Sequence, residues 1–256
     1  MRTSRPARAL ACGLLALLLT PAGRARAVDG VIEINQARAT KGGITPGDMP
    51  GFPITISADT SSSGPTSFRL TGPLFNSTTD NVIEIISPHV TVDLNGFAIT
   101  CLIAPCAGDG IHSDQINITV MNGTVRGFAS GVNLSGNGAR VENVRAVGNT
   151  NAGVHLGNDC IARNNLGAGN GNEGIRVGNA CTVSNNVANS NMTSGICTGL
   201  ASNVFGNTAS GNAAYGLNLT TSTGYSQNVI SGNTLGTVFS GVSAGLNVCN
   251  GNPTCP

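Results

Sequence analysis

The sequence predicts an all-β fold, a single-stranded right-handed parallel β-helix of about seven coils with an N-terminal capping segment. Three regularities predict it. A glycine recurs at nearly constant spacing from Gly110 to Gly241, an aliphatic–polar–aliphatic triplet follows most of these glycines, and an asparagine stands at the same offset after each of the first six. Self-similarity at a period of roughly 20 residues is typical of solenoids, in which each repeat is one coil.

The triplets predict one short strand in every coil. They are clearest at Gly131–Leu134, Gly153–Leu156 and Gly174–Val177; the series begins at Gly110, and weaker copies start at Gly195, Gly216 and Gly241. Because successive side chains of a strand point to opposite faces, the aliphatic members should fill the interior and the middle member should face outward. The predicted outward row is His112, Asn133, His155, Arg176, Cys197 and Asn218.

The recurring asparagines predict ladders of stacked amides along the coils. Asparagine tolerates the left-handed conformation that tight bends need, and its amide can bond to the same amide in the next coil. The structural file predicted at the constant offset from the glycines is Asn122, Asn143, Asn165, Asn186, Asn207 and Asn228. A second file is predicted near the end of each coil, at Asn149, Asn170, Asn191, Asn212 and Asn233.

The stretch 1–27 has the layout of a signal peptide. Three arginines precede an apolar run from Ala9 to Leu19, and the small-residue pattern Ala25–Ala27 follows it. The run is too short to cross a bilayer, which needs about 20 apolar residues. We therefore expect export to the periplasm or the medium, without stable membrane insertion.

The rest of the chain divides by composition into three parts. Residues 28–53 form an N-terminal cap and linker, in which Val31 to Lys41 is expected to be a short amphipathic helix that stops at Gly42-Gly43. Residues 54–248 form the β-helix, and residues 249–256 form a disulfide-tied tail. The expected opening strands are Ile54–Ile56, Ser67–Leu70, Val82–Ile86 and Val90–Leu94.

Export gives the cysteines a structural meaning, because free thiols survive poorly in an oxidising compartment. Cys101 with Cys106, and Cys249 with Cys255, are close enough in sequence to close small loops. Cys160 and Cys181 stand at the same offset from their glycines, which would stack them in adjacent coils as either a disulfide or a pair of buried thiols. Cys197 is then left over, and no histidine shares the Cys160 column to suggest a metal site.

The pattern from Asn81 to Asn247 resembles the right-handed β-helix, or pectate-lyase-like, superfamily. The stretch Val90–Phe97 is similar to early coils of that superfamily, and Val28–Asn35 looks like the mature N-terminus of exported bacterial β-helix repeat proteins that have no assigned activity. The resemblance implies architecture more than chemistry. Members with this fold include polysaccharide lyases, glycoside hydrolases and epimerases, and also surface proteins without catalysis.

The chemistry of the catalytic members is missing from the sequence. A calcium-dependent lyase needs a cluster of carboxylates, and a hydrolase needs several carboxylates around one glycosidic oxygen. After Val120 only Glu142, Asp159 and Glu173 are acidic, and the sole lysine is Lys41. The Gly-His-Gly and Arg-x-Lys elements of the polygalacturonase type are also absent.

The outward row is the best candidate site that remains. Arg176 could bind a sugar carboxylate and His155 could move a proton, with Glu173 or Asp114 nearby. His112 with Asp109 and Asp114 is a second, weaker candidate. The alternative is that all of these are ordinary solvated residues on a strand face or around a bend.

These observations predict an exported β-helix protein with a structural, surface-interaction or glycan-binding role. The alternative is a carbohydrate-active enzyme, a lyase or epimerase acting on an acidic polysaccharide. The expected partner is a polysaccharide or cell-surface glycan. With 13 basic and 12 acidic residues, the chain has no strong net positive charge that would attract nucleic acid. Nothing predicts a cofactor or a metal, and without tryptophan the aromatic platform for sugar rings is thin.

Overall fold

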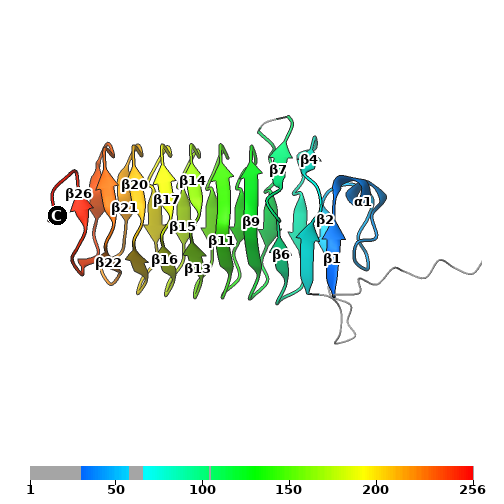
Figure 1. Cartoon of the computed structure of the whole chain (residues 1–256), viewed down its shortest axis with the longest axis horizontal. Coiled ribbons are helices and arrows are strands. Elements are labelled where there is room, and N and C mark those ends of the chain that lie inside the picture. The colour runs from blue at the N-terminus through cyan, green and yellow to red at the C-terminus, as the bar shows by residue number, and fades with distance from the viewer. Residues whose placement is uncertain (1–29, 58–65, 104, 256) are drawn as a thin grey trace, which may run out of the picture.

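The protein is a rod of stacked β-coils (Figure 1). The computed structural model describes residues 30–57, 66–103 and 105–255. The predicted signal peptide, residues 1–27, lies outside these ranges. Among the described residues, no helix is long and apolar enough to cross a membrane.

A nine-stranded parallel sheet runs along one side of the rod and receives one strand from each coil. The predicted β-helix is therefore confirmed, but it has about nine coils rather than seven. The two additional coils escaped the repeat because they are longer than the others, as the pairing of Ile54 with Ile83 and of Ile83 with Ile111 shows. The nine strands are β2 (Ile54–Ile56), β5 (Ile83–Ile85), β8 (Ile111–Ser113), β10 (Val132–Leu134), β12 (Val154–Leu156), β15 (Ile175–Val177), β18 (Ile196–Thr198), β21 (Tyr215–Asn218) and β24 (Gly236–Phe239).

The last strand of this sheet corrects one predicted repeat. Tyr215 pairs with Gly236 and Leu217 with Val238, so Thr237 stands where the preceding coil has Gly216. The spacing of the preceding coils is thus kept to the end of the sheet. The prediction that a repeat starts at Gly241 is therefore wrong; Gly241 follows β24 with a φ of +96°, a bend conformation that favours glycine.

The remaining strands form a seventeen-stranded parallel sheet on the other sides of the rod. Most coils add two short strands to it, which merge into one longer strand in β9 and in β11. All the opening strands predicted from the sequence are present. The members are β1 (Val31–Ile34), β3 (Ser67–Leu70), β4 (Leu74–Asn76), β6 (Thr91–Asp93), β7 (Ala98–Cys101), β9 (Thr119–Arg126), β11 (Arg140–Val147), β13 (Ile161–Arg163), β14 (Leu166–Ala168), β16 (Thr182–Ser184), β17 (Val187–Asn189), β19 (Asn203–Phe205), β20 (Thr208–Ser210), β22 (Gly224–Ser226), β23 (Val229–Ser231), β25 (Val242–Ser243) and β26 (Val248–Cys249).

The aliphatic members of the triplets fill the interior as predicted; Val132, Val154 and Ile175 are fully buried. The glycine before each triplet is required by close packing between coils. A Cβ atom on Gly153 would lie 2.6 Å from the carbonyl oxygen of Gly174 and 2.7 Å from the amide nitrogen of Asn170. The recurring glycine therefore makes room for the ladder asparagine beside it.

The asparagine ladders are present, but two of the six predicted members of the first file, Asn122 and Asn143, lie outside its buried part. Asn165, Asn186, Asn207 and Asn228 are buried, and each accepts a hydrogen bond at Oδ1 from the backbone N–H of the residue before it in the file. The first donor is Val144, because the slightly longer interval between Gly131 and Gly153 shifts the register by one position. Asn143 is instead an exposed bend residue with a φ of +54°, and its amide donates to Oδ1 of Asn122. The second file, Asn149, Asn170, Asn191, Asn212 and Asn233, is continuous.

The two ends of the rod are built differently (Figure 1). The expected N-terminal helix is shorter than predicted, because Val31–Ile34 pairs with β3 as strand β1. The helix α1 (Gln36–Lys41) follows it; Asn35 Oδ1 caps its start by accepting from Arg38 N–H, and Gly42 ends it with a φ of +67°.

Three disulfides form among the described cysteines, Cys101–Cys106, Cys160–Cys181 and Cys249–Cys255, and Cys197 is free.

Candidate functional site

The predicted outward row exists as a column of paired residues on the nine-stranded sheet. His112, Asn133, His155, Arg176, Cys197 and Asn218 each pair with the next residue in the column. The column begins earlier and ends later than predicted, with Thr55 and Glu84 before His112 and Phe239 after Asn218. Neighbouring strands lie about 4.8 Å apart, so adjacent side chains of the column are within contact reach.

One end of the column is a closed hydrogen-bonded cluster around Asp109. Asp109 Oδ1 accepts from Ser130 N–H at 2.8 Å, and Oδ2 accepts from Asn133 Nδ2 at 2.8 Å and lies 3.1 Å from His112 Nδ1. Two further carboxylates face His112 Nε2, Glu84 at 4.0 Å and Asp114 at 3.7 Å. Glu84 was not among the predicted site residues, because its Ile83-Glu84-Ile85 triplet follows a valine, not a glycine.

These contacts set the charges of the cluster. The hydrogen bond to Asp109 raises the pKa of His112 against the opposing effect of burial, and Glu84 and Asp114 add to the rise. Burial alone would raise the pKa of Asp109, but hydrogen bonds from His112, Asn133 and Ser130 outweigh it and leave that pKa lowered. The cluster is therefore one imidazole held among three carboxylates, with both oxygens of Asp109 engaged by donors.

The middle of the column is an open cluster of His155, Glu173 and Arg176. Arg176 Nη1 lies 4.0 Å from Glu173 Oε1, and the side chains are 52% and 13% exposed. Glu173 Oε2 is buried and has no hydrogen-bond partner within the described part of the chain. Burial and the nearby Arg176 lower the pKa of His155, so the imidazole is neutral at neutral pH and can donate from one nitrogen and accept at the other.

A hollow of about 350 Å³ opens beside this cluster, at the ends of three neighbouring strands. Its polar lining comes from His155, Arg176, Cys197 and Thr198, and glycines 157, 178 and 199 leave its floor without side chains. Burial raises the pKa of the Cys197 thiol, with Glu173 adding to the rise. The thiol is thus a neutral group in the wall and not an activated nucleophile.

The structure brings together only part of the predicted site. His155, Arg176 and Glu173 meet, whereas Asp114 contacts His112 and accepts a hydrogen bond from the Ser135 hydroxyl. Asn133 separates the two groups, and its Oδ1 is a second buried oxygen without a partner in the described ranges. The column therefore contains a closed half, around His112 and Asp109, and an open half, around His155, Glu173 and Arg176.

Comparison with protein families places the chain in one of them. A family model described as periplasmic copper-binding protein (NosD) matches residues 88–252, well over half of the sequence. The chain belongs to the NosD family. A periplasmic family agrees with the expectation of an exported protein and leaves periplasm and medium undistinguished.

A solved structure with the same fold is the Dettilon tailspike protein, at a TM-score of 0.50 and 13% sequence identity. The match covers 77% of the NosD-family chain and 52% of the tailspike chain, so the present chain spans about half the tailspike's length. At this identity the likeness concerns the fold alone. No curated protein sequence matches the chain.

The far end of the column in this NosD-family chain carries an aromatic pair that sequence analysis missed. The rings of Tyr215 and Phe239 have centroids 5.2 Å apart, and Phe239 is 52% exposed. Phe239 stands three strands beyond Arg176 in the column. The repeat that starts at Thr237 would have placed it there, but Gly241 was taken as the repeat start. Tyr225 is buried in the core.

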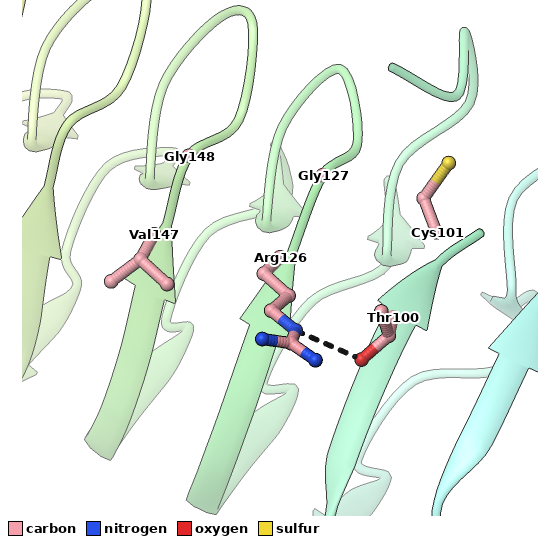
Figure 2. A pocket seen from close by; sticks show the side chains of 6 residues that line it. All are labelled: Thr100, Cys101, Arg126, Gly127, Val147 and Gly148. Carbon is pink, nitrogen blue, oxygen red and sulfur yellow. Dashed lines mark hydrogen bonds between the residues drawn. The ribbon is translucent and has the colours of Figure 1, made fainter. Parts of the chain in front are cut away.

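A second hollow of the NosD-family chain, about 560 Å³, lies on the seventeen-stranded sheet (Figure 2). Thr100, Arg126 and Val147 line it from three neighbouring strands, and Arg126 Nε donates to Thr100 Oγ1 at 3.2 Å. The rest of the lining is Cys101 and two bend glycines, Gly127 and Gly148. No pattern in the sequence indicated this hollow, which has one charged side chain in its wall.

Proposed function

We propose that this protein is an exported glycan-binding protein that holds an acidic oligosaccharide along the open half of the column. The observation that carries the proposal is the ion pair between Arg176 Nη1 and Glu173 Oε1, beside a second Glu173 oxygen, Oε2, that is buried without a hydrogen-bond partner in the described residues. A buried acceptor without a partner costs about 1–3 kcal/mol, which a donor from a ligand would recover. Sugar hydroxyls are such donors.

The neighbouring groups fit the same ligand class. Half of the Arg176 side chain is exposed and offers N–H donors to a uronate carboxylate. The neutral His155 can bond to a hydroxyl in either direction. Further along the column, Tyr215 and Phe239 offer an aromatic surface against which the apolar face of a sugar ring can pack.

The copper named in the family description does not fit the residues present. In the described ranges no group of three or more histidine, cysteine or acidic side chains could hold a metal ion. Copper prefers thiolate, thioether or imidazole ligands. The free Cys197 pairs with Arg176, whose positive charge opposes a cation, and His112 is engaged by Asp109. We therefore derive no function through copper.

Calorimetric titration of the exported protein with oligogalacturonate tests the glycan proposal. We expect binding that Arg176→Ala weakens about tenfold or more, as for loss of a charged hydrogen bond. The matched control is Arg163→Ala. Arg163 is similarly exposed and paired with Glu142, but it lies on the other sheet, so this variant should bind normally. Equal loss in both variants, or no binding to any acidic oligosaccharide, would contradict the proposal.

A second candidate, a lyase or epimerase on the same face, is favoured by the lowered pKa of His155. The neutral imidazole could remove the proton α to a uronate carboxylate held by Arg176. In a lyase the electron pair left by that proton forms the double bond to the adjacent carbon, and the glycosidic oxygen leaves and takes a proton from water. Absorbance from unsaturated sugar ends that disappears in His155→Ala would establish this activity; its absence leaves binding alone.

A further inference from the structure

The C-terminal third of the chain has no charged side chains. Residues 177–256 contain no Asp, Glu, Lys, Arg or His, although 13 basic and 12 acidic residues occur in the whole sequence. This stretch builds the last coils, from β16 to β26. Natural sheet proteins commonly place charged residues at exposed strand edges to prevent pairing with other chains. The last coils of this rod have no such protection.

The last coil also leaves strand edges open. β24 pairs with β21 and β25 pairs with β22, and in the described ranges no further strand follows on their outer sides. Only β26 has its outer side partly covered, by the antiparallel bridge between Cys249 and Asn252 inside the Cys249–Cys255 loop. The unpaired N–H and C=O groups of such edges are templates for another strand.

Large apolar side chains gather in the same coil. Leu235 is 64% exposed, Val242 57% and Leu246 77%, and all three belong to the turns and the short strand around β24 and β25. Scattered apolar residues on a surface need no explanation, but a group beside open strand edges is typical of an interface.

The opposite end of the rod differs in each respect. Helix α1 lies across it (Figure 1), and Glu33, Arg38 and Lys41 add charge there. A head-to-tail contact would therefore set a charged, covered end against an uncharged, open end. A tail-to-tail contact sets two identical open ends together.

We propose that the C-terminal end of the rod binds a second copy of this chain, tail to tail, about a two-fold axis perpendicular both to the rod and to strand β24. Across such an axis β24 meets its own copy in antiparallel orientation, which is self-complementary for backbone hydrogen bonds. No charged side chains oppose each other, because the last coils carry none. Within the described residues each rod has one end with uncovered strand edges, so the association closes at a dimer.

Sedimentation of the exported protein at micromolar concentration tests this proposal. We expect twice the chain mass for the wild type and the chain mass for Val242→Lys and for Leu235→Lys, because a lysine buried in this uncharged contact loses its hydration without gaining a partner, which should weaken association by about a hundredfold. The control is Val187→Lys, at a 37% exposed position on the side of the rod, which should stay dimeric.

A wild type with the mass of one chain would overturn the proposal. So would a dimer that survives both Val242→Lys and Leu235→Lys, or one that Val187→Lys alone dissociates. Circular dichroism of each variant separates a lost interface from a lost fold, since these side chains are exposed and the single chains should stay folded.

Discussion

The coils before and after Gly153 are built from the same repeat but use equivalent positions differently. Asp109 and Glu173 each stand immediately before a triplet glycine and at the same offset before the outward side chain, His112 or Arg176. Asp109 accepts hydrogen bonds from three partners, whereas one oxygen of Glu173 has none within the described residues. A repeat position therefore fixes where a side chain lies but not whether its bonding capacity is used.

The cause of the difference is visible in the next coil. Asp109 is short enough to accept from Ser130 N–H, and Asn133 supplies a second donor. The equivalent residues beside Glu173 are Ser194 and Cys197, and a thiol is a weak donor. The longer Glu173 side chain instead reaches toward Arg176, and its Oε2 is buried without a hydrogen-bond partner in the described residues.

The asparagines show the same contrast and give the largest expected effect. Asn186→Ala should lower the free energy of unfolding by about 3 kcal/mol, because Asn165 N–H and the carbonyl of Ala162 lose their buried partner. Asn143→Ala, at the same offset from its glycine but exposed, should cost less than about 1 kcal/mol. Urea denaturation measures both, and equal losses would refute the distinction between buried file and exposed bend.

A smaller effect on stability is expected at the two equivalent acidic residues, Asp109 and Glu173. Asp109→Ala should destabilise the fold by about 2 kcal/mol, since three donors lose their acceptor. Glu173→Ala should leave the free energy of unfolding unchanged or raise it by about 1 kcal/mol, because the oxygen that it removes is buried without a partner in the described chain, but it should weaken glycan binding. Thermal unfolding and glycan titration of both variants test this difference. A stability loss in Glu173→Ala as large as that in Asp109→Ala would show that the two acidic residues are equivalent.

The smallest effect is a difference in pH dependence between the two histidines. The raised pKa of His112 stabilises the fold below the unfolded value of about 6.5, and this contribution is lost as pH rises through the folded pKa. The lowered pKa of His155 has the opposite sign, because the unfolded chain gains a proton first as pH falls.

His112→Gln should therefore lower the melting temperature more at about pH 5.5 than at about pH 8, and His155→Gln should raise it relative to wild type at the acidic value only. Melting curves at both pH values test this, with His89→Gln as the control. Changes of the same sign in both variants would show that the two environments are not distinct.

The fold could be predicted from the sequence because each sequence repeat corresponds to one coil. The triplet, the bend residues and the ladder asparagine recur at equivalent positions of successive coils. The column from His112 to Asn218 could therefore be predicted from the spacing alone. Spacing failed where it changes: the long coils at Ile54 and Ile83 were missed, and Asn143 was placed one position out of register.

The site was predictable only as a row. That Glu84 belongs to the His112 cluster, that Glu173 keeps an oxygen free and that Phe239 extends the column depend on side-chain length and on the next coil. These are contacts between side chains of neighbouring coils, and residue type alone does not record whether a hydrogen bond forms.

Nuclear magnetic resonance of the imidazoles can show whether the open half of the column binds an acidic glycan while the closed half does not. The chain has three histidines, so few signals need assignment. Titrating oligogalacturonate into the exported protein should shift the His155 resonances and leave those of His112 and His89 in place. Shifts at His112 with none at His155, or no shift at all, would rule out this division of the column.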